Sequence, residues 1–192
     1  MARTNISIDQ KVFDEFSAQA ERQNKTLFAF ANESLATMTK VASEGGTPTE
    51  LYGVWRSTNI LKQIDVITLP SDFVDEVIAR LWADGGEETL KMFSELGKKL
   101  VGVLKIAAPD IKELSKLEQD LGGLLPIKQL SINETGAGGY EINVVGAGRR
   151  IESTECAREF LIAIVRGYGF SVAKQETGFG TIRLWVVPKV GQ

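Results

Sequence analysis

Residues 3–40 read RTNISIDQKVFDEFSAQAERQNKTLFAFANESLATMTK, and their hydrophobic period changes once. Over residues 3–8 polar and apolar side chains alternate, and this period of two predicts a β-strand. The polar members of the strand are Arg3, Asn5 and Ser7, and the apolar members are Ile6 and Ile8. From Asp9 onward apolar residues recur every three or four positions, which predicts an amphipathic helix with Asp9 as its N-cap.

A second helix is predicted directly after the first. Asn24 tolerates the left-handed conformation that ends a helix, and Thr26 is a suitable N-cap for the next one. The apolar face of this second helix ends at a segment rich in glycine, proline and threonine near residues 43–50. The N-terminal part of the chain is therefore expected to fold as strand, helix, short turn and helix.

The totals exclude several classes of protein. The chain has 192 residues, a formal net charge of −3, one cysteine and no histidine. An internal disulfide and a Ser-His-Asp triad are therefore excluded, and any contact with phosphates must be local. We expect no signal peptide and no membrane helix, which together with the single cysteine predicts a cytoplasmic protein.

An isolated strand leaves its backbone donors and acceptors unpaired, so the strand over residues 3–8 needs a partner. The simplest partner is the same strand of a second copy across a two-fold axis. A two-stranded ribbon fits the major groove of DNA, with Arg3, Asn5 and Ser7 as the side chains that contact bases. The sequence thus predicts a homodimer or a higher even oligomer that binds double-stranded DNA at a palindromic operator.

The quoted stretch resembles the ribbon-helix-helix family, which includes Arc and MetJ. The resemblance implies an intertwined βαα dimer that also holds DNA phosphate at the start of its second helix, where the helix dipole is positive. The residues that this role falls on are Arg22, Lys25, Thr26, Leu27 and Phe28. Two departures from the family are Asn24 in place of its usual glycine and a domain that is not basic.

The chain is divided into three parts. Residues 1–43 are the predicted ribbon-helix-helix domain, residues 44–58 a linker, and residues 59–192 an α+β domain with antiparallel strands. A helix is expected from Ser71, a break at the sequence DGG, and a long helix after it that contains Gly97 and Gly102 for close packing. Two later hairpins flank one more helix.

The second domain offers little for catalysis, so we expect no enzyme, no catalytic residue, no cofactor and no metal site. Cys156 is interpreted as a small buried residue in preference to a reactive thiol. Arg149 and Arg150 precede a helix N-terminus, where they either hold an anion or are simply solvated. Six aromatic residues either form the core or line a cavity for a small hydrophobic ligand. They are Trp55, Trp82, Tyr140, Tyr168, Phe170 and Trp185.

The order of elements and glycines in the second domain weakly resembles the vinyl-reductase-type sensor domain, whose relatives include TRAPP trafficking subunits. That resemblance implies a small hydrophobic ligand or a partner protein, and no zinc, because the family's cysteines are absent here. A metal-responsive repressor is an alternative, although its nickel site cannot form without histidine.

The function predicted from the sequence is a DNA-binding transcriptional regulator, of the repressor type, whose C-terminal domain senses a ligand or adds subunit contacts. The alternative is a non-enzymatic interaction module, antitoxin-like or a scaffold, whose N-terminal segment serves only dimerisation.

Overall fold

The computed structural model describes residues 5–63, 69–121, 127–136 and 138–189. The chain divides into two compact units, Met1–Tyr52 and Gly53–Gln192. Helix α3, Pro48–Gln63, runs across the division, so the segment that the sequence analysis treats as a linker is helical from residue 48 onward. Each unit is described by itself below.

The first unit contains helices α1, Gln10–Arg22, and α2, Leu27–Ser43. The predicted caps are confirmed: the Asp9 carboxylate accepts the amide hydrogen of Lys11 at 2.9 Å, and the Thr26 hydroxyl accepts that of Ala29 at 3.2 Å. Asn24 has the expected left-handed backbone, with φ of 53°.

The predicted N-terminal strand is wrong. Residues 5–9 form no strand, Arg3 lies outside the described residues, and the first regular element is α1. Ile6 and Ile8 are 65% and 54% exposed, so this face is not buried. Polar and apolar residues can also alternate over six positions in an irregular extended segment. Alternation alone does not make a strand, because a strand also needs the edge of a neighbouring strand to pair with. The βαα fold class and the intertwined dimer built on that strand are therefore wrong as well.

The second unit holds the sheet, and its antiparallel α+β arrangement follows the sequence pattern. Helix α4, Ser71–Ala107, is followed by the short 3-10 helix η1, Ile111–Glu113, and by α5, Leu114–Leu121. The two predicted hairpins and the helix between them are present. They are β1, Gln129–Thr135; β2, Gly139–Val145; α6, Ile151–Gly167; β3, Phe170–Gly178; and β4, Thr181–Pro188.

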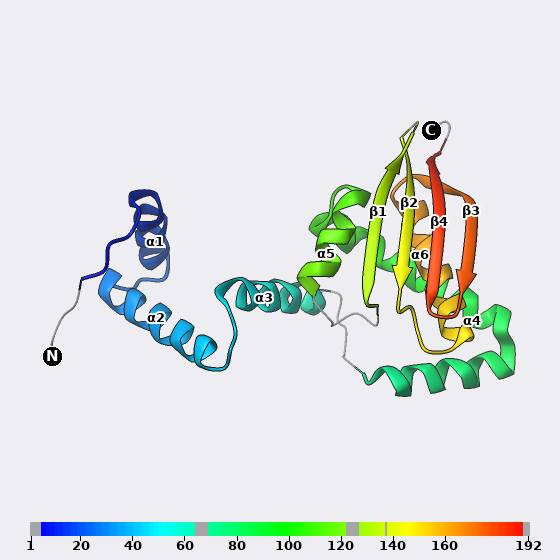
Figure 1. Ribbon diagram of the computed structural model, residues 1–192, viewed down its shortest axis with the longest axis horizontal. Helices are drawn as coiled ribbons and strands as arrows, with labels where there is room; N and C mark the ends of the chain where they lie inside the picture. Colours follow the sequence, from blue (N-terminus) through cyan, green and yellow to red (C-terminus); the bar gives the residue numbers. More distant parts are fainter. Residues whose placement is uncertain (1–4, 64–68, 122–126, 137, 190–192) are drawn as a thin grey trace. The chain divides into compact units, whose positions relative to one another are not determined.

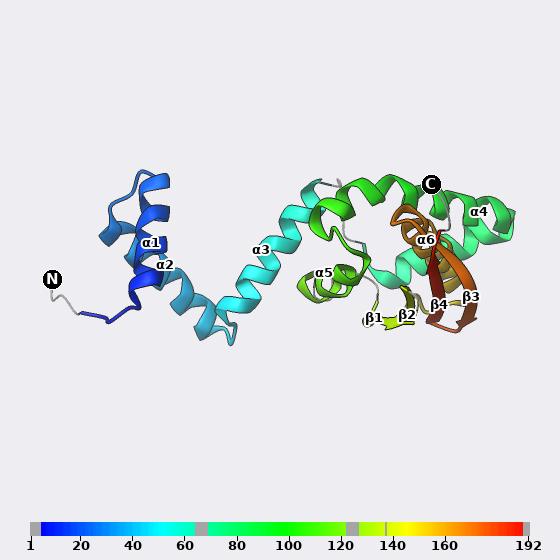
Figure 2. The ribbon, with the colours of Figure 1, turned by 90° about the horizontal axis from the view of Figure 1, so that it is seen from above.

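The four strands form one antiparallel sheet in the order β1-β2-β4-β3. Helices α6 and α4 cover one face of this sheet, and no described helix of the unit covers the other (Figures 1 and 2). Alternate side chains of β2 and β4 point into the covered face, as an antiparallel sheet with one solvated side requires. The buried members are Tyr140, Ile142, Val144, Ile182, Leu184 and Val186.

Helix α4 breaks where the sequence predicts it. Gly85 departs from helical dihedrals, with φ of 177° and ψ of 85°, and divides α4 into two helical segments. The second segment packs closely on α6, because a Cβ atom at Gly97 would lie 2.5 Å from the carbonyl oxygen of Phe160. The close-packing role predicted for Gly97 is confirmed, whereas that for Gly102 is wrong, since nothing lies within 4 Å of its Cβ position.

The loop before α6 is held by acidic residues of α4. The carboxylate of Asp75, a residue only 6% exposed, accepts the backbone amide hydrogen of Arg149 at 3.1 Å. The Arg149 guanidinium pairs with Asp72, and that of Arg150 pairs with Glu76 at 2.8 Å. Both arginines therefore have carboxylate partners, whereas the sequence analysis left them either to hold an anion or to be solvated.

Among the described helices, none is long and apolar enough to cross a membrane.

Candidate functional site

The uncovered face of the sheet carries its polar side chains in rows that cross the strands. The strand register aligns Ser131, Asn143, Arg183 and Glu176 in a first row, here called the charged row. The second row, called the tryptophan row, aligns Asn133, Glu141, Trp185 and Lys174. On the other side of the charged row lies a third row, called the small row, that aligns Gln129, Val145, Thr181 and Gly178.

Three side chains fix one another where the charged row meets the tryptophan row. The Nε of Arg183 donates to the Oδ1 of Asn143 at 2.9 Å and lies 2.8 Å from the Oε1 of Glu141. The Nδ2 of Asn143 donates to the same carboxylate oxygen at 3.2 Å. The guanidinium is thereby held by β2 in one orientation on the sheet, since hydrogen bonds to an ionised partner are the stronger ones.

Trp185 lies between two cations. The Nζ of Lys174 is 4.3 Å from a ring centroid of the indole, and the Cζ of Arg183 is 5.2 Å from it, both within the range of cation–π attraction. Lys174 also pairs with Glu176 at 2.7 Å, and this hydrogen bond lowers the pKa of the Glu176 carboxyl. The charges of the two rows cancel, because two cations stand beside two carboxylates.

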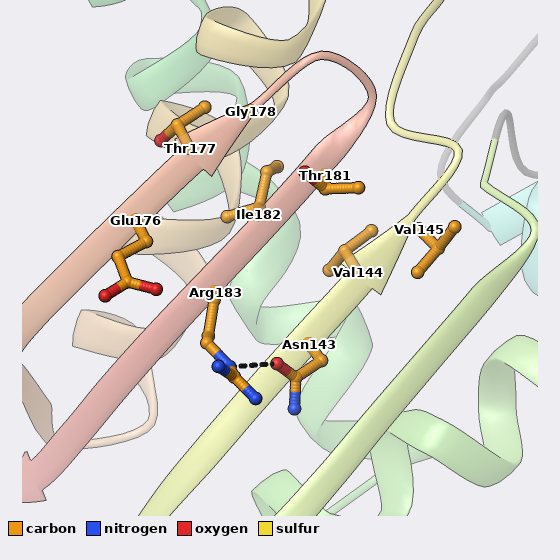
Figure 3. A pocket seen from close by; sticks show the side chains of 9 residues that line it. All are labelled: Asn143, Val144, Val145, Glu176, Thr177, Gly178, Thr181, Ile182 and Arg183. Carbon is orange, nitrogen blue, oxygen red and sulfur yellow. Dashed lines mark hydrogen bonds between the residues drawn. The ribbon is translucent and has the colours of Figure 1, made fainter.

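A shallow depression of about 330 Å³ lies between the charged row and the small row (Figure 3). It exists because Gly178 has no side chain and Thr181 has a short one, while Arg183 and Glu176 rise beside them. Its lining residues are Asn143, Val144, Val145, Glu176, Thr177, Gly178, Thr181, Ile182 and Arg183.

The depression has the chemistry of a binding site. Its rim carries a guanidinium, a carboxamide, a carboxylate and hydroxyl groups, which together donate and accept hydrogen bonds. Small-molecule sites combine a concave apolar surface with a few such groups. A nucleophile hydrogen-bonded to a general base is not found among the described lining residues.

Sequence reasoning did not single out Asn143, Glu176 or Arg183. The signal was nevertheless in the sequence, since Asn143 and Arg183 occupy the polar positions of alternating strands. Such alternation predicts a solvated face but not which residues of four strands share a row. That depends on register, which is set by turns and bulges.

The residues predicted to contact DNA belong to the first unit, and Asn5 and Ser7 are exposed there. Three of the five predicted phosphate contacts lie together at the start of α2, where Thr26 caps the helix, Lys25 pairs with Glu33, and Phe28 is 68% exposed. The remaining ones are Leu27, beside that cap, and Arg22, in the last turn of α1. Contact of these side chains with nucleic acid stays a prediction that no observation tests.

The aromatic residues do not gather around one cavity. Tyr140 and Phe170 pack edge to face within the core, with ring centroids 5.4 Å apart, whereas Trp185 lies on the opposite, uncovered face of the sheet. The core interpretation is thus correct for the first two. None of the six aromatic residues lines the depression described above, so a small hydrophobic ligand stays a prediction.

The chain matches no known family model and no curated protein. Solved structures that resemble it are H-NOX domains. An oxygen-binding H-NOX domain related to soluble guanylate cyclases is 13% identical, with a TM-score of 0.39, over 63% of this chain and 72% of that one. A structure from a study of heme distortion in the H-NOX family is 15% identical, with a TM-score of 0.41, over 81% and 94%. A mutant of the T. tengcongensis H-NOX domain is 14% identical, with a TM-score of 0.40, over 67% and 82%.

The structure corrects the identification made from the sequence. The N-terminal strand on which the ribbon-helix-helix resemblance rests is absent from the described residues 5–9, and the first regular element is α1, which overturns that resemblance. The DNA-binding repressor, its palindromic DNA partner, dimerisation through a β-ribbon and the antitoxin-like or scaffold alternative are wrong with it.

The depression does not offer the residues that hold a heme. Proteins hold heme iron through histidine, cysteine thiolate, methionine or tyrosine, and this sequence has no histidine. Cys156 is fully buried, and that burial, with negative charge from Glu155, raises the pKa of its thiol to about 11. The Tyr168 hydroxyl donates to the Ala108 carbonyl at 2.7 Å. The depression is lined by none of these residue types.

Tyr168→Phe is expected to change the alkaline stability of the second unit. Burial raises the pKa of the Tyr168 phenol to about 12, above the value of about 10 in an unfolded chain. The neutral phenol therefore stabilises the fold fully below about pH 10, and this stability is lost as the pH rises through about 12. In urea unfolding, the variant should lose about 1 kcal/mol at pH 7 with its hydrogen bond. It should then decline less steeply than wild type toward pH 11. Equal slopes for Tyr168→Phe and wild type would contradict the assignment.

Proposed function

We propose that the second unit is a non-catalytic ligand-binding module that senses a small zwitterionic molecule in the depression on its uncovered sheet face. The observation that carries the proposal is the fixed Arg183 guanidinium, held by Asn143 and Glu141 at the edge of a concave surface. A cytoplasmic location belongs to the same proposal and is supported by the single, buried cysteine.

The charges at the depression support a ligand that carries one positive and one negative group. The contacts of Arg183 with Asn143 and Glu141 both use Nε, so the terminal nitrogens remain to donate to a ligand carboxylate. The Glu176 carboxylate stands opposite Arg183 on β3 and pairs with Lys174 at 2.7 Å, so a ligand ammonium group would share this carboxylate with Lys174. A free amino acid has both groups a short distance apart, which makes amino acids the ligand class that we propose.

The solved structures that resemble this chain include one described as oxygen-binding. A sensing role is the one part of the sequence-based function that agrees with them. Heme is not part of the proposal, because the depression is lined by no histidine, cysteine, methionine or tyrosine.

The proposal is tested by titrating the full chain with free amino acids while tryptophan fluorescence is recorded, since Trp185 borders the charged row. Each amino acid is compared with its amide, which lacks the carboxylate, and with the matching carboxylic acid, which lacks the ammonium group. We expect at least one zwitterion to bind. Arg183→Ala should weaken that binding about 10- to 100-fold, which is the loss of a charged hydrogen bond of about 1.5–3 kcal/mol.

Arg166→Ala is the matched control, because Arg166 is an exposed arginine in the last turn of α6, on the covered side of the sheet. It should leave the affinity unchanged. If no amino acid binds at millimolar concentration, or if Arg183→Ala and wild type bind equally, the proposed function is incorrect.

A further inference from the structure

The two outer strands of the sheet differ in how their edges are protected. Strand β3 is irregular at its edge, because the register with β4 shifts between Val172 and Lys174. Its middle is also charged, with Lys174 and Glu176. Bulges and charges are the features by which proteins keep an edge strand from pairing with another chain. The β3 edge is therefore protected.

Strand β1 lacks the bulge that protects β3. All seven of its residues pair with β2 without a shift, from Gln129 opposite Val145 to Thr135 opposite Gly139. Its outer edge pairs with no strand among the residues that the structure describes. Glu134, its charged residue, is engaged by Lys112 at 3.0 Å. The β1 edge is therefore regular, and backbone groups along it are available to a further strand.

Helix α5 lies beside this edge (Figures 1 and 2), and a cleft runs between the helix and the strand. The cleft measures about 470 Å³ and is lined by Ser115 and Glu118 of α5 and by six consecutive residues, 128–133. It thus follows the strand along its length. A helix beside a regular strand edge is the setting in which several domains bind an extended peptide as an added strand.

We propose that the cleft between α5 and β1 binds an extended segment of a partner protein as a fifth strand of the sheet. The partner's backbone would hydrogen-bond to β1, and its side chains would alternate between two environments. One set would lie against the half-buried Leu130 and Ile132, which favour apolar residues, with Ser115 and Glu118 of α5 on the other side. The other set would continue the rows that begin at Ser131 and Asn133, which favours polar residues.

A single strand fits this cleft better than the sheet of a second copy. Because α5 lies along the outer side of the cleft, there is room beside β1 for one extended segment. Symmetric pairing of two β1 edges would bring the α5 helix of each copy against the sheet of the other. The occupant is therefore an extended segment that is not part of another sheet. Its sequence alternates apolar and polar residues.

The test uses a phage-displayed library of random dodecapeptides, selected on the full chain, followed by fluorescence anisotropy with the synthesised consensus peptide. We expect a consensus that alternates apolar and polar residues, and slower hydrogen exchange of β1 amides in its presence. Ser115→Trp fills the cleft and should weaken binding at least 10-fold. Lys116→Trp, one residue along on α5 and outside the lining, should bind as wild type does.

Circular dichroism establishes that Ser115→Trp is folded, and Glu118→Arg, a charge change at the same wall, replaces it if it is not. Equal binding by the folded cleft variant and wild type would overturn the proposal, as would protection of β3 in place of β1. A selection without any consensus would also overturn it. Self-association of the chain that Ser115→Trp abolishes would identify a second copy as the occupant and overturn the partner segment. None of these outcomes depends on the amino-acid site, since the cleft and the depression share no lining residue.

Discussion

Gly97→Val is expected to lower the free energy of unfolding by about 3 kcal/mol, the upper part of the range for overpacking a core. The Cβ of any other residue at this position would meet the Phe160 carbonyl oxygen at 2.5 Å and the Ala163 Cβ at 2.9 Å. These neighbours belong to α6, whose position is fixed between α4 and the sheet, so neither gives way easily. Urea unfolding followed by circular dichroism measures the loss.

Gly102→Ala provides the matched control five residues further along the same helix. Nothing lies within 4 Å of its Cβ position, so alanine adds helix propensity without a clash and should raise the stability by up to about 1 kcal/mol. Opposite signs for the two substitutions would confirm that α4 approaches α6 at Gly97. A stable Gly97→Val variant would show that the two helices do not pack this closely.

The Cys156 thiol is expected to react with maleimide at least about a thousandfold more slowly in the native chain than in the urea-unfolded chain. Cys156 is 0% exposed, so the reagent reaches it only when α6 separates from its neighbours, at a cost of the order of 5 kcal/mol or more. Burial, together with nearby glutamates, also raises its pKa to about 11, which keeps the reactive thiolate scarce at pH 8.

The raised pKa of the Cys156 thiol also predicts that the free energy of unfolding depends on pH. Because the folded pKa of about 11 exceeds the unfolded value of about 8.5, the contribution of Cys156 is complete below about pH 8.5 and is lost as the pH rises through 11. Cys156→Ala should be less stable at pH 7, because it leaves a small cavity, yet decline less between pH 9 and 11. Rapid native-state labelling at pH 8 would contradict the buried position.

Local signals in the sequence were sufficient for several helices, although not for α3, most of which the sequence analysis assigns to a linker. Asp9 and Thr26 cap the helices that they were expected to cap, and the DGG sequence divides α4 at Gly85, because capping and chain breaks depend on residues within a few positions. Both late hairpins and the helix between them follow from alternation and turn glycines in the same way.

The N-terminal segment shows where local pattern fails. Residues 3–8 alternate as a strand does, but alternation does not supply a partner edge, and the described part of the segment is irregular. The prediction of close packing at Gly102 is wrong for a related reason. A glycine in a helix indicates close packing only if another element is present at that point, as α6 is at Gly97 and is not at Gly102.

The sequence by itself determined the helix ends, the hairpin turns and the absence of histidine, all of which are properties of single residues or short stretches. Only the tertiary structure decided that Asn143, Arg183 and Glu176 share a row, and that α5 lies beside the regular edge of β1. The physical reason is that both sites are made by strand register and by the packing of elements distant in sequence. A displacement of one residue in register would move Arg183 to the other face of the sheet.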